Sequence, residues 1–126
     1  MTGASILLVE DNIGVQRFIA RVLRLEGAIV ATVSTGEEAL SLITSAAPYD
    51  LVVLDLCLPD MTGWDVLDGI RLTYPSQAAC PVVILTARSD DESRRRAASL
   101  GVGFLAKPIG AKDLVTGLRP FVRRDA

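Results

Sequence analysis

The strongest constraint on the fold is the alternation of short apolar runs with segments of helical period. The runs have strand length and consist almost entirely of hydrophobic residues; they cover residues 6–9, 28–33, 51–54, 82–85 and 103–106. Strands buried on both faces have this pattern, because helices cover both sides of a parallel sheet. Five strands alternating with five helical segments therefore predict an α/β fold with a single doubly wound parallel sheet and right-handed crossovers.

The segments between the runs carry helix start and stop signals. Capping-box spacings at residues 34–37 and 89–92 predict that the second and fourth helices begin there. The last helix is expected at residues 111–123, where Gly117 weakens and Pro120 interrupts a helix interior. We therefore expect this helix to be short or kinked.

Bulk composition sets wide limits on function. Half of the 126 residues are hydrophobic, which is enough to bury the core of one domain spanning residues 1–126. The formal net charge of −2 gives no strong field for nucleic acid or an anionic membrane. No apolar stretch approaches the roughly 20 residues that cross a bilayer. The first residues lack the basic and apolar regions of a signal peptide, so we expect a cytoplasmic domain.

Polar residues directly follow four of the five expected strands. Glu10 and Asp11 follow the first strand, Asp55 the third, Thr86 the fourth and Lys107 the fifth. In open parallel sheets, ligands bind at the carboxyl ends of the strands, where the strand order reverses. If the first and third strands are neighbours, as in the flavodoxin-like order 2-1-3-4-5, the three carboxylates share one pocket.

A pocket with three carboxylates favours a hard cation. Like charges this close repel each other and raise at least one pKa unless a counter-ion is present. An oxygen-only ligand set with several waters suits Mg²⁺ best. A carboxylate beside a hydroxyl, an ammonium and a bound cation can attack phosphorus and form an aspartyl phosphate.

These motifs resemble the receiver domain of two-component response regulators, and the resemblance covers essentially the whole chain. They are the acidic pair Glu10-Asp11, the segment 53–63 around Asp55, the pair Thr86-Ala87 and the pair Lys107-Pro108. The resemblance implies that Asp55 is the phosphoacceptor. It also implies that Glu10, Asp11, Asp55 and the backbone carbonyl of Cys57 hold Mg²⁺.

The resemblance implies roles for further groups. Thr86 and Lys107 would bind the phosphoryl group, and the Lys107-Pro108 peptide bond would be cis. In this family the threonine hydroxyl moves toward the phosphoryl group and an aromatic ring on the fifth strand turns inward; Phe104 stands at that position. The responding surface would comprise the fourth helix, the fifth strand and the fifth helix. Such a domain is not an enzyme for external substrates and only gains and slowly loses its own phosphoryl group.

The chain contains no histidine, so the phosphodonor must be another protein, a histidine kinase or a histidine phosphotransfer protein. The first helix is expected to carry the docking surface, through residues such as Gln16 and Arg17.

The three arginines at 94–96 are interpreted as a solvated helix face. We expect either a stand-alone receiver or a regulator with an output domain beyond Ala126, DNA-binding or other. The domain itself should bind neither nucleic acid nor membrane, and should be a monomer or weak dimer.

Two other functions use a similar sheet. A haloacid-dehalogenase-like phosphatase also forms an aspartyl phosphate, but it needs a second Asp two residues after the nucleophile, where this chain has Cys57. A flavodoxin-like cofactor-binding module needs a phosphate-cradling loop after the first strand, where Glu10 and Asp11 would repel the phosphate. The receiver interpretation is therefore preferred.

Overall fold

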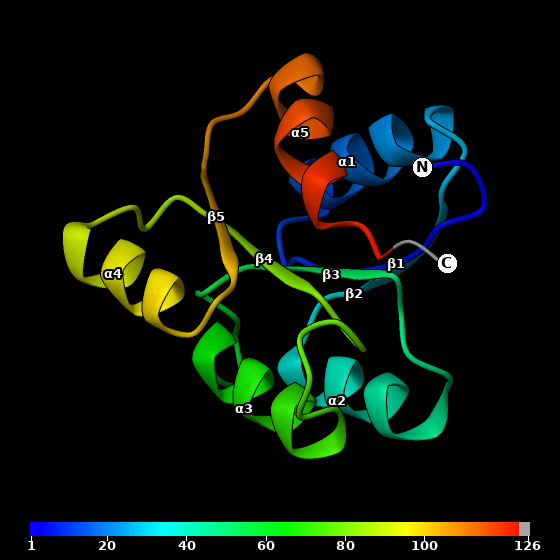
Figure 1. The fold of residues 1–126 in the computed structure, drawn as a ribbon. Helices are drawn as coiled ribbons and strands as arrows, with labels where there is room; N and C mark the ends of the chain where they lie inside the picture. Colours follow the sequence, from blue (N-terminus) through cyan, green and yellow to red (C-terminus); the bar gives the residue numbers. More distant parts are fainter. Residues whose placement is uncertain (124–126) are drawn as a thin grey trace.

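The computed structural model describes residues 1–123 and contains a five-stranded parallel sheet in the order β2-β1-β3-β4-β5. Strands and helices alternate along the chain (Figure 1) as β1 (Ser5–Val9), α1 (Ile13–Leu25), β2 (Ile29–Val33), α2 (Gly36–Ser45), β3 (Leu51–Leu54), α3 (Gly63–Thr73), β4 (Val82–Thr86), α4 (Asp91–Ser99), β5 (Gly103–Ala106) and α5 (Ala111–Leu118). The predicted fold and strand order are confirmed. The last three residues of the expected domain range lie outside the described residues.

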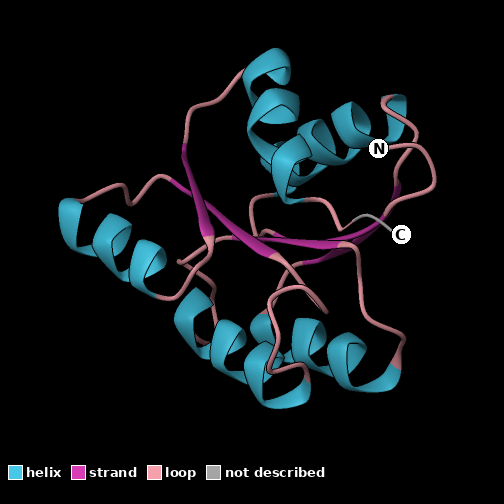
Figure 2. Ribbon diagram, viewed as in Figure 1, coloured by secondary structure: helices cyan, strands magenta, loops and turns pink. Residues whose placement is uncertain are grey.

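Helices cover both faces of the sheet, and each face has its own hydrophobic core. α1 and α5 lie on one face and α2 and α3 on the other, while α4 lies beside β5 (Figures 1 and 2). In β1, Ile6 and Leu8 pack toward α1 and α5, whereas Leu7 and Val9 pack toward α2 and α3. The apolar runs are continuous because both sets of side chains are buried. Within the described residues, no helix has both the length and the apolar character needed to cross a membrane.

Two helices are capped one residue later than the predicted spacings placed them. Thr35 caps α2 by accepting a hydrogen bond from the Glu38 N–H at 3.1 Å. Asp90 caps α4, and its Oδ1 accepts from the Ser93 N–H at 2.8 Å. Each predicted spacing begins with two adjacent residues that can cap a helix, so the sequence pattern alone does not decide which of the two is the cap.

The last helix is short, as predicted. α5 ends at Leu118, and Arg119–Phe121, which contains Pro120, forms one turn of 3₁₀-helix. Gly117 faces β5, where a Cβ atom would lie only 2.8 Å from the side chain of Leu105. A glycine at this position therefore allows α5 to pack closely on the sheet.

Candidate functional site

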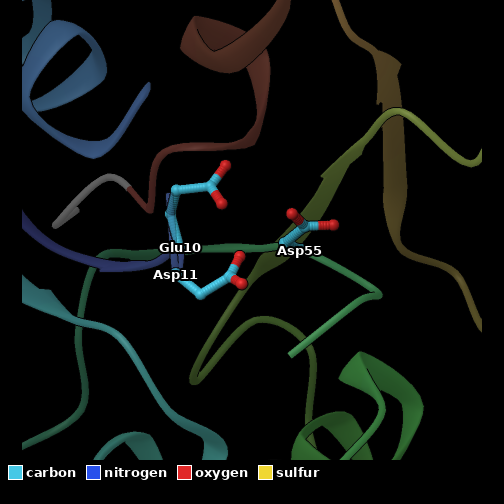
Figure 3. Close-up of side chains that lie close together, drawn as sticks. All are labelled: Glu10, Asp11 and Asp55. Carbon is cyan, nitrogen blue, oxygen red and sulfur yellow. The ribbon is translucent and has the colours of Figure 1, made fainter. Parts of the chain in front are cut away.

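Strand pairing brings the three acidic residues together. Val9 of β1 pairs with Leu54 of β3, and the Asp55 N–H donates to the Val9 carbonyl at 3.1 Å. One carboxylate oxygen each from Glu10, Asp11 and Asp55 lies within 4.8 Å of the others. Figure 3 shows Glu10 and Asp11 projecting from the end of β1 toward the side on which Asp55 lies. The acids thus converge at the carboxyl edge of the sheet, as the strand-end pattern predicts.

Lys107 supplies the positive charge of this cluster. Its Nζ donates hydrogen bonds to Oε1 of Glu10 and, at 2.9 Å, to Oδ2 of Asp55. Its backbone N–H donates to the carbonyl of Thr86 at 2.9 Å, which ties the ends of β4 and β5 together. The Lys107-Pro108 peptide bond is cis, as expected from the resemblance. Lys107 therefore links carboxylates from two different strands.

Burial and the neighbouring charges shift the pKa values of Glu10 and Lys107 in opposite directions. Glu10 is 2% exposed, and the loss of water raises the pKa of its carboxyl; the Lys107 ammonium only partly offsets this effect. Burial alone would lower the pKa of Lys107, but its hydrogen bonds to Glu10 and Asp55 outweigh burial and raise that pKa. Three carboxylates against one ammonium leave the cluster with excess negative charge.

The donor set of the cluster fits a hard divalent cation. Glu10 and Asp55 are buried and Asp11 is exposed, so the carboxylate oxygens lie at an edge that water can reach. The Cys57 thiol is exposed, while its N–H donates to Oδ1 of Asp55 at 3.2 Å. Carboxylate oxygens combined with access for water match the preferences of Mg²⁺.

The loop after Asp55 is held against the start of α3. A Cβ atom at Gly63 would collide with the Asp55 carbonyl oxygen and would lie 2.9 Å from the Cα of Leu56. The Gly63 N–H donates to the Leu56 carbonyl at 2.8 Å. Thr62 and Asp65 form a reciprocal capping box at the start of α3. The backbone that carries Asp55 is therefore closely packed.

Thr86 and Phe104 lie on the same face of neighbouring strands. In the register of β4 and β5, Ile84 pairs with Phe104 and Thr86 pairs with Ala106. Thr86 is buried, and its hydroxyl accepts a hydrogen bond from the Arg88 N–H at 3.2 Å. Phe104 is half-buried at the border of the core.

Two of the three consecutive arginines on α4 contact aromatic rings. The guanidinium carbon of Arg94 lies 4.9 Å from the ring centroid of Phe104, and that of Arg96 lies 4.5 Å from the centroid of Trp64. All three arginines are exposed, as predicted, and Arg94 and Arg96 in addition lie over aromatic rings. The helix pattern did not reveal these contacts, because the rings belong to β5 and α3.

Gln16 is buried, which contradicts its predicted role in docking. The buried face of α1 consists of Gln16, Ile19, Ala20 and Leu23. The Gln16 amide donates to the carbonyls of Glu10 and Val33, whereas the neighbouring Arg17 is exposed. Gln16 lies three and four residues before Ile19 and Ala20, and this spacing places it on the same buried face of the helix. That spacing is the sequence signal for its burial, and sequence reasoning missed it.

A family model and curated relatives match most of this chain. A family model described as the response regulator receiver domain matches residues 6–119. The transcriptional regulatory protein KdpE of Mycobacterium tuberculosis is 36% identical over 121 residues, which make up 95% of this chain and 51% of that protein. The chain thus spans about half the length of the curated relatives it matches.

Solved structures with the same fold cover nearly the whole chain. The non-phosphorylated HemR receiver domain from Leptospira biflexa has a TM-score of 0.87 and 32% identity, with 98% of this chain and 97% of that chain covered. The receiver domain of a sensor histidine kinase from Pseudomonas aeruginosa, with a magnesium ion coordinated in its active site cleft, has a TM-score of 0.82 and 30% identity, with 95% and 98% covered. The chain belongs to the family of response regulator receiver domains.

Proposed function

We propose that this chain is a phosphoryl-accepting signalling domain in which Asp55 takes phosphate from a histidine kinase or histidine phosphotransfer protein, with Mg²⁺ bound. The proposal treats residues 1–126 as one receiver domain. The observation that carries it is the position of Asp55, which contacts the Lys107 ammonium and belongs to the acidic cluster at the end of the sheet.

Glu10, Asp11, Asp55 and the backbone carbonyl of Cys57 would hold the cation. The excess negative charge of the cluster supports this assignment, as does the magnesium ion in the receiver domain from P. aeruginosa. When bound, Mg²⁺ would neutralise charge on the phosphoryl oxygens during transfer.

The side chains around Asp55 would supply the other contacts. An Asp55 oxygen forms the new O–P bond while the P–N bond of the donor phosphohistidine breaks, and the electron pair of that bond stays on the imidazole. The Lys107 ammonium, now 2.9 Å from Asp55, would bind one phosphoryl oxygen. The Thr86 hydroxyl would exchange its contact with the Arg88 N–H for another phosphoryl oxygen.

Movement of Thr86 would be transmitted to the surface formed by α4, β5 and α5. Phe104 lies on the same face as Thr86 and also contacts Arg94 of α4. A rotation of the Phe104 ring would therefore change its contact with Arg94, and with it a contact that holds α4. Phosphorylation would shift the population between two arrangements of this surface.

The phosphorylated surface would control an output partner or domain. KdpE is a transcriptional regulatory protein, and this chain matches about half of its length. An output domain beyond Ala126 would accordingly be DNA-binding or of another type. The short α5 favours a monomer or weak dimer over a dimer built on a long last helix.

The alternative of a haloacid-dehalogenase-like phosphatase is not favoured. That chemistry needs an acid two residues after the nucleophile to move a proton. The residue there is Cys57, whose side chain is exposed.

Intact mass spectrometry after incubation with acetyl phosphate and Mg²⁺ tests the proposal. Wild type should gain one phosphoryl group that is labile to base, and Asp55→Asn should gain none. Asp68→Asn, an exposed position on α3, is the matched control and should label like wild type. Labelling that survives in Asp55→Asn would place the phosphoacceptor elsewhere.

A further inference from the structure

Gln16 is one of the few buried polar side chains, and its amide nitrogen is fully used. Nε2 donates hydrogen bonds to the carbonyl of Glu10 at 2.8 Å and to the carbonyl of Val33 at 3.1 Å. Ser34 Oγ lies 3.3 Å from the same nitrogen. An amide NH₂ group has two donors, so the two carbonyls occupy both.

The carbonyl that Gln16 holds belongs to the peptide unit between Glu10 and Asp11. Because a peptide unit is planar, fixing its carbonyl also fixes the relative directions of the Cα atoms on either side. A rotation of this unit would turn the Asp11 side chain relative to Glu10. One hydrogen bond from Gln16 therefore acts on two carboxylates without touching either of them.

The second carbonyl, that of Val33, ties this peptide unit to the neighbouring strand β2. Val33 is the last residue of β2, and its carbonyl also accepts the Glu10 N–H at 3.1 Å. Gln16 thus connects the ends of β1 and β2 to α1. Both carbonyls would lose a buried donor if the Gln16 amide were removed.

We propose that Gln16 is a positioning residue that orients Glu10 and Asp11 for a divalent cation. This inference rests on the proposed function, because it assumes that the acidic cluster binds Mg²⁺. Gln16 acts through the backbone, because within the described residues its amide donates to main-chain carbonyls and to the Ser34 hydroxyl but to no carboxylate. Groups that orient metal ligands from behind typically change metal affinity by about 10-fold to 100-fold when removed.

Calorimetric titration with Mg²⁺ alone tests this role. Gln16→Met keeps the side-chain length and removes both donors, and it should weaken Mg²⁺ binding about 10-fold. Arg17→Met, at the exposed neighbouring position, is the matched control and should bind Mg²⁺ like wild type. At saturating Mg²⁺, Gln16→Met should be phosphorylated by acetyl phosphate at the wild-type rate, because Asp55 and Lys107 follow other strands, β3 and β5, and have no hydrogen bond from Gln16.

The outcomes separate this inference from the proposed function. If wild type binds Mg²⁺ and Gln16→Met binds it equally well, the inference is wrong while the proposed function stands. A slower rate at saturating Mg²⁺ with unchanged affinity would also overturn it, because the substitution would then act on transfer. Wild type that takes up no Mg²⁺ at millimolar concentration would contradict both.

If Gln16→Met does not fold, a measurement on wild type can still contradict the inference. The Gln16 side-chain amide protons should exchange with solvent more slowly than those of Gln77, because both Gln16 donors are bonded and buried. The Gln77 side-chain nitrogen donates no hydrogen bond within the described residues and serves as the internal control. Equal exchange of the two amides would overturn the inference.

Discussion

Arg94 of α4 lies over the ring of Phe104 of β5, with its guanidinium carbon 4.9 Å from the ring centroid. A second stack, of Arg96 on Trp64, connects α4 to α3. These contacts matter because α4 buries only two small side chains and has no large apolar residue facing the core. The two cation–π contacts therefore add to the small amount of hydrophobic packing that holds α4.

Removing the first stack should loosen α4. Arg94→Ala should increase the rate of backbone amide exchange within Asp91–Ser99 and cost about 0.5–1 kcal/mol of stability, the usual range for an exposed cation–π pair. Hydrogen exchange with mass spectrometry measures the effect. Arg95→Ala, on the same helix, is the matched control, and equal exchange in the two variants would show that the stack does not hold α4.

Removing the ammonium of the acidic cluster should destabilise the domain. Lys107→Met leaves Glu10 and Asp55 buried without their counter-ion, which should cost about 3 kcal/mol in urea unfolding. If the cluster binds Mg²⁺ as proposed, the cation should stabilise the variant more than wild type, because it would bind only the folded cluster and would meet no competing ammonium. Lys112→Met, exposed on α5, should stay within about 0.5 kcal/mol of wild type. A Lys107→Met domain as stable as wild type without Mg²⁺ would contradict the ion-pair assignment.

Asp60 should contribute to the loss of stability in acid. Its two carboxylate oxygens each accept a backbone N–H at the start of α2, from Gly36 and Glu37 at 2.9 Å, and these bonds hold its pKa below the ordinary value of 3.8. A lowered folded pKa gives stability that is complete above the unfolded pKa and is lost as the pH falls through the folded pKa. The stability difference between wild type and Asp60→Asn should therefore shrink below pH 3.8. Urea unfolding over a pH series checks this, and a difference that stays constant to lower pH would disprove it.

A methyl group against the backbone carbonyl of Asp55 should disturb the site. Gly63→Ala places a Cβ atom against the Asp55 carbonyl, so the loop or α3 must shift, at a cost of about 1–3 kcal/mol. Phosphorylation by acetyl phosphate should become slower, because Asp55 moves relative to Lys107. Gly110→Ala is the matched control, since a Cβ atom there meets nothing within 4 Å. If both variants retain wild-type stability and rate, the close packing behind Asp55 has no consequence.

The fold and the meeting of the acids could be predicted because both follow from local patterns. Continuous apolar runs with helices between them allow few topologies other than a doubly wound parallel sheet. In such a sheet, residues that follow neighbouring strands meet at one edge, so Glu10, Asp11 and Asp55 converge. The glycine and proline in the last helix likewise act within a few residues, and α5 is short.

The partners of individual side chains were decided only by the tertiary structure. The sequence pattern places Gln16 on the docking surface, but its side chain is buried and donates to the ends of two strands. Arg94 and Arg96 are exposed as predicted, but the pattern does not show that they lie over rings from other elements. Each partner is distant in sequence or depends on the rotation of a helix about its axis. The sequence by itself therefore determined the sheet and the edge at which the acids stand, because strand burial and helix period are properties of short segments. Packing between segments decided which donors hold those acids in place, because a hydrogen bond requires two groups to lie within about 3 Å of each other.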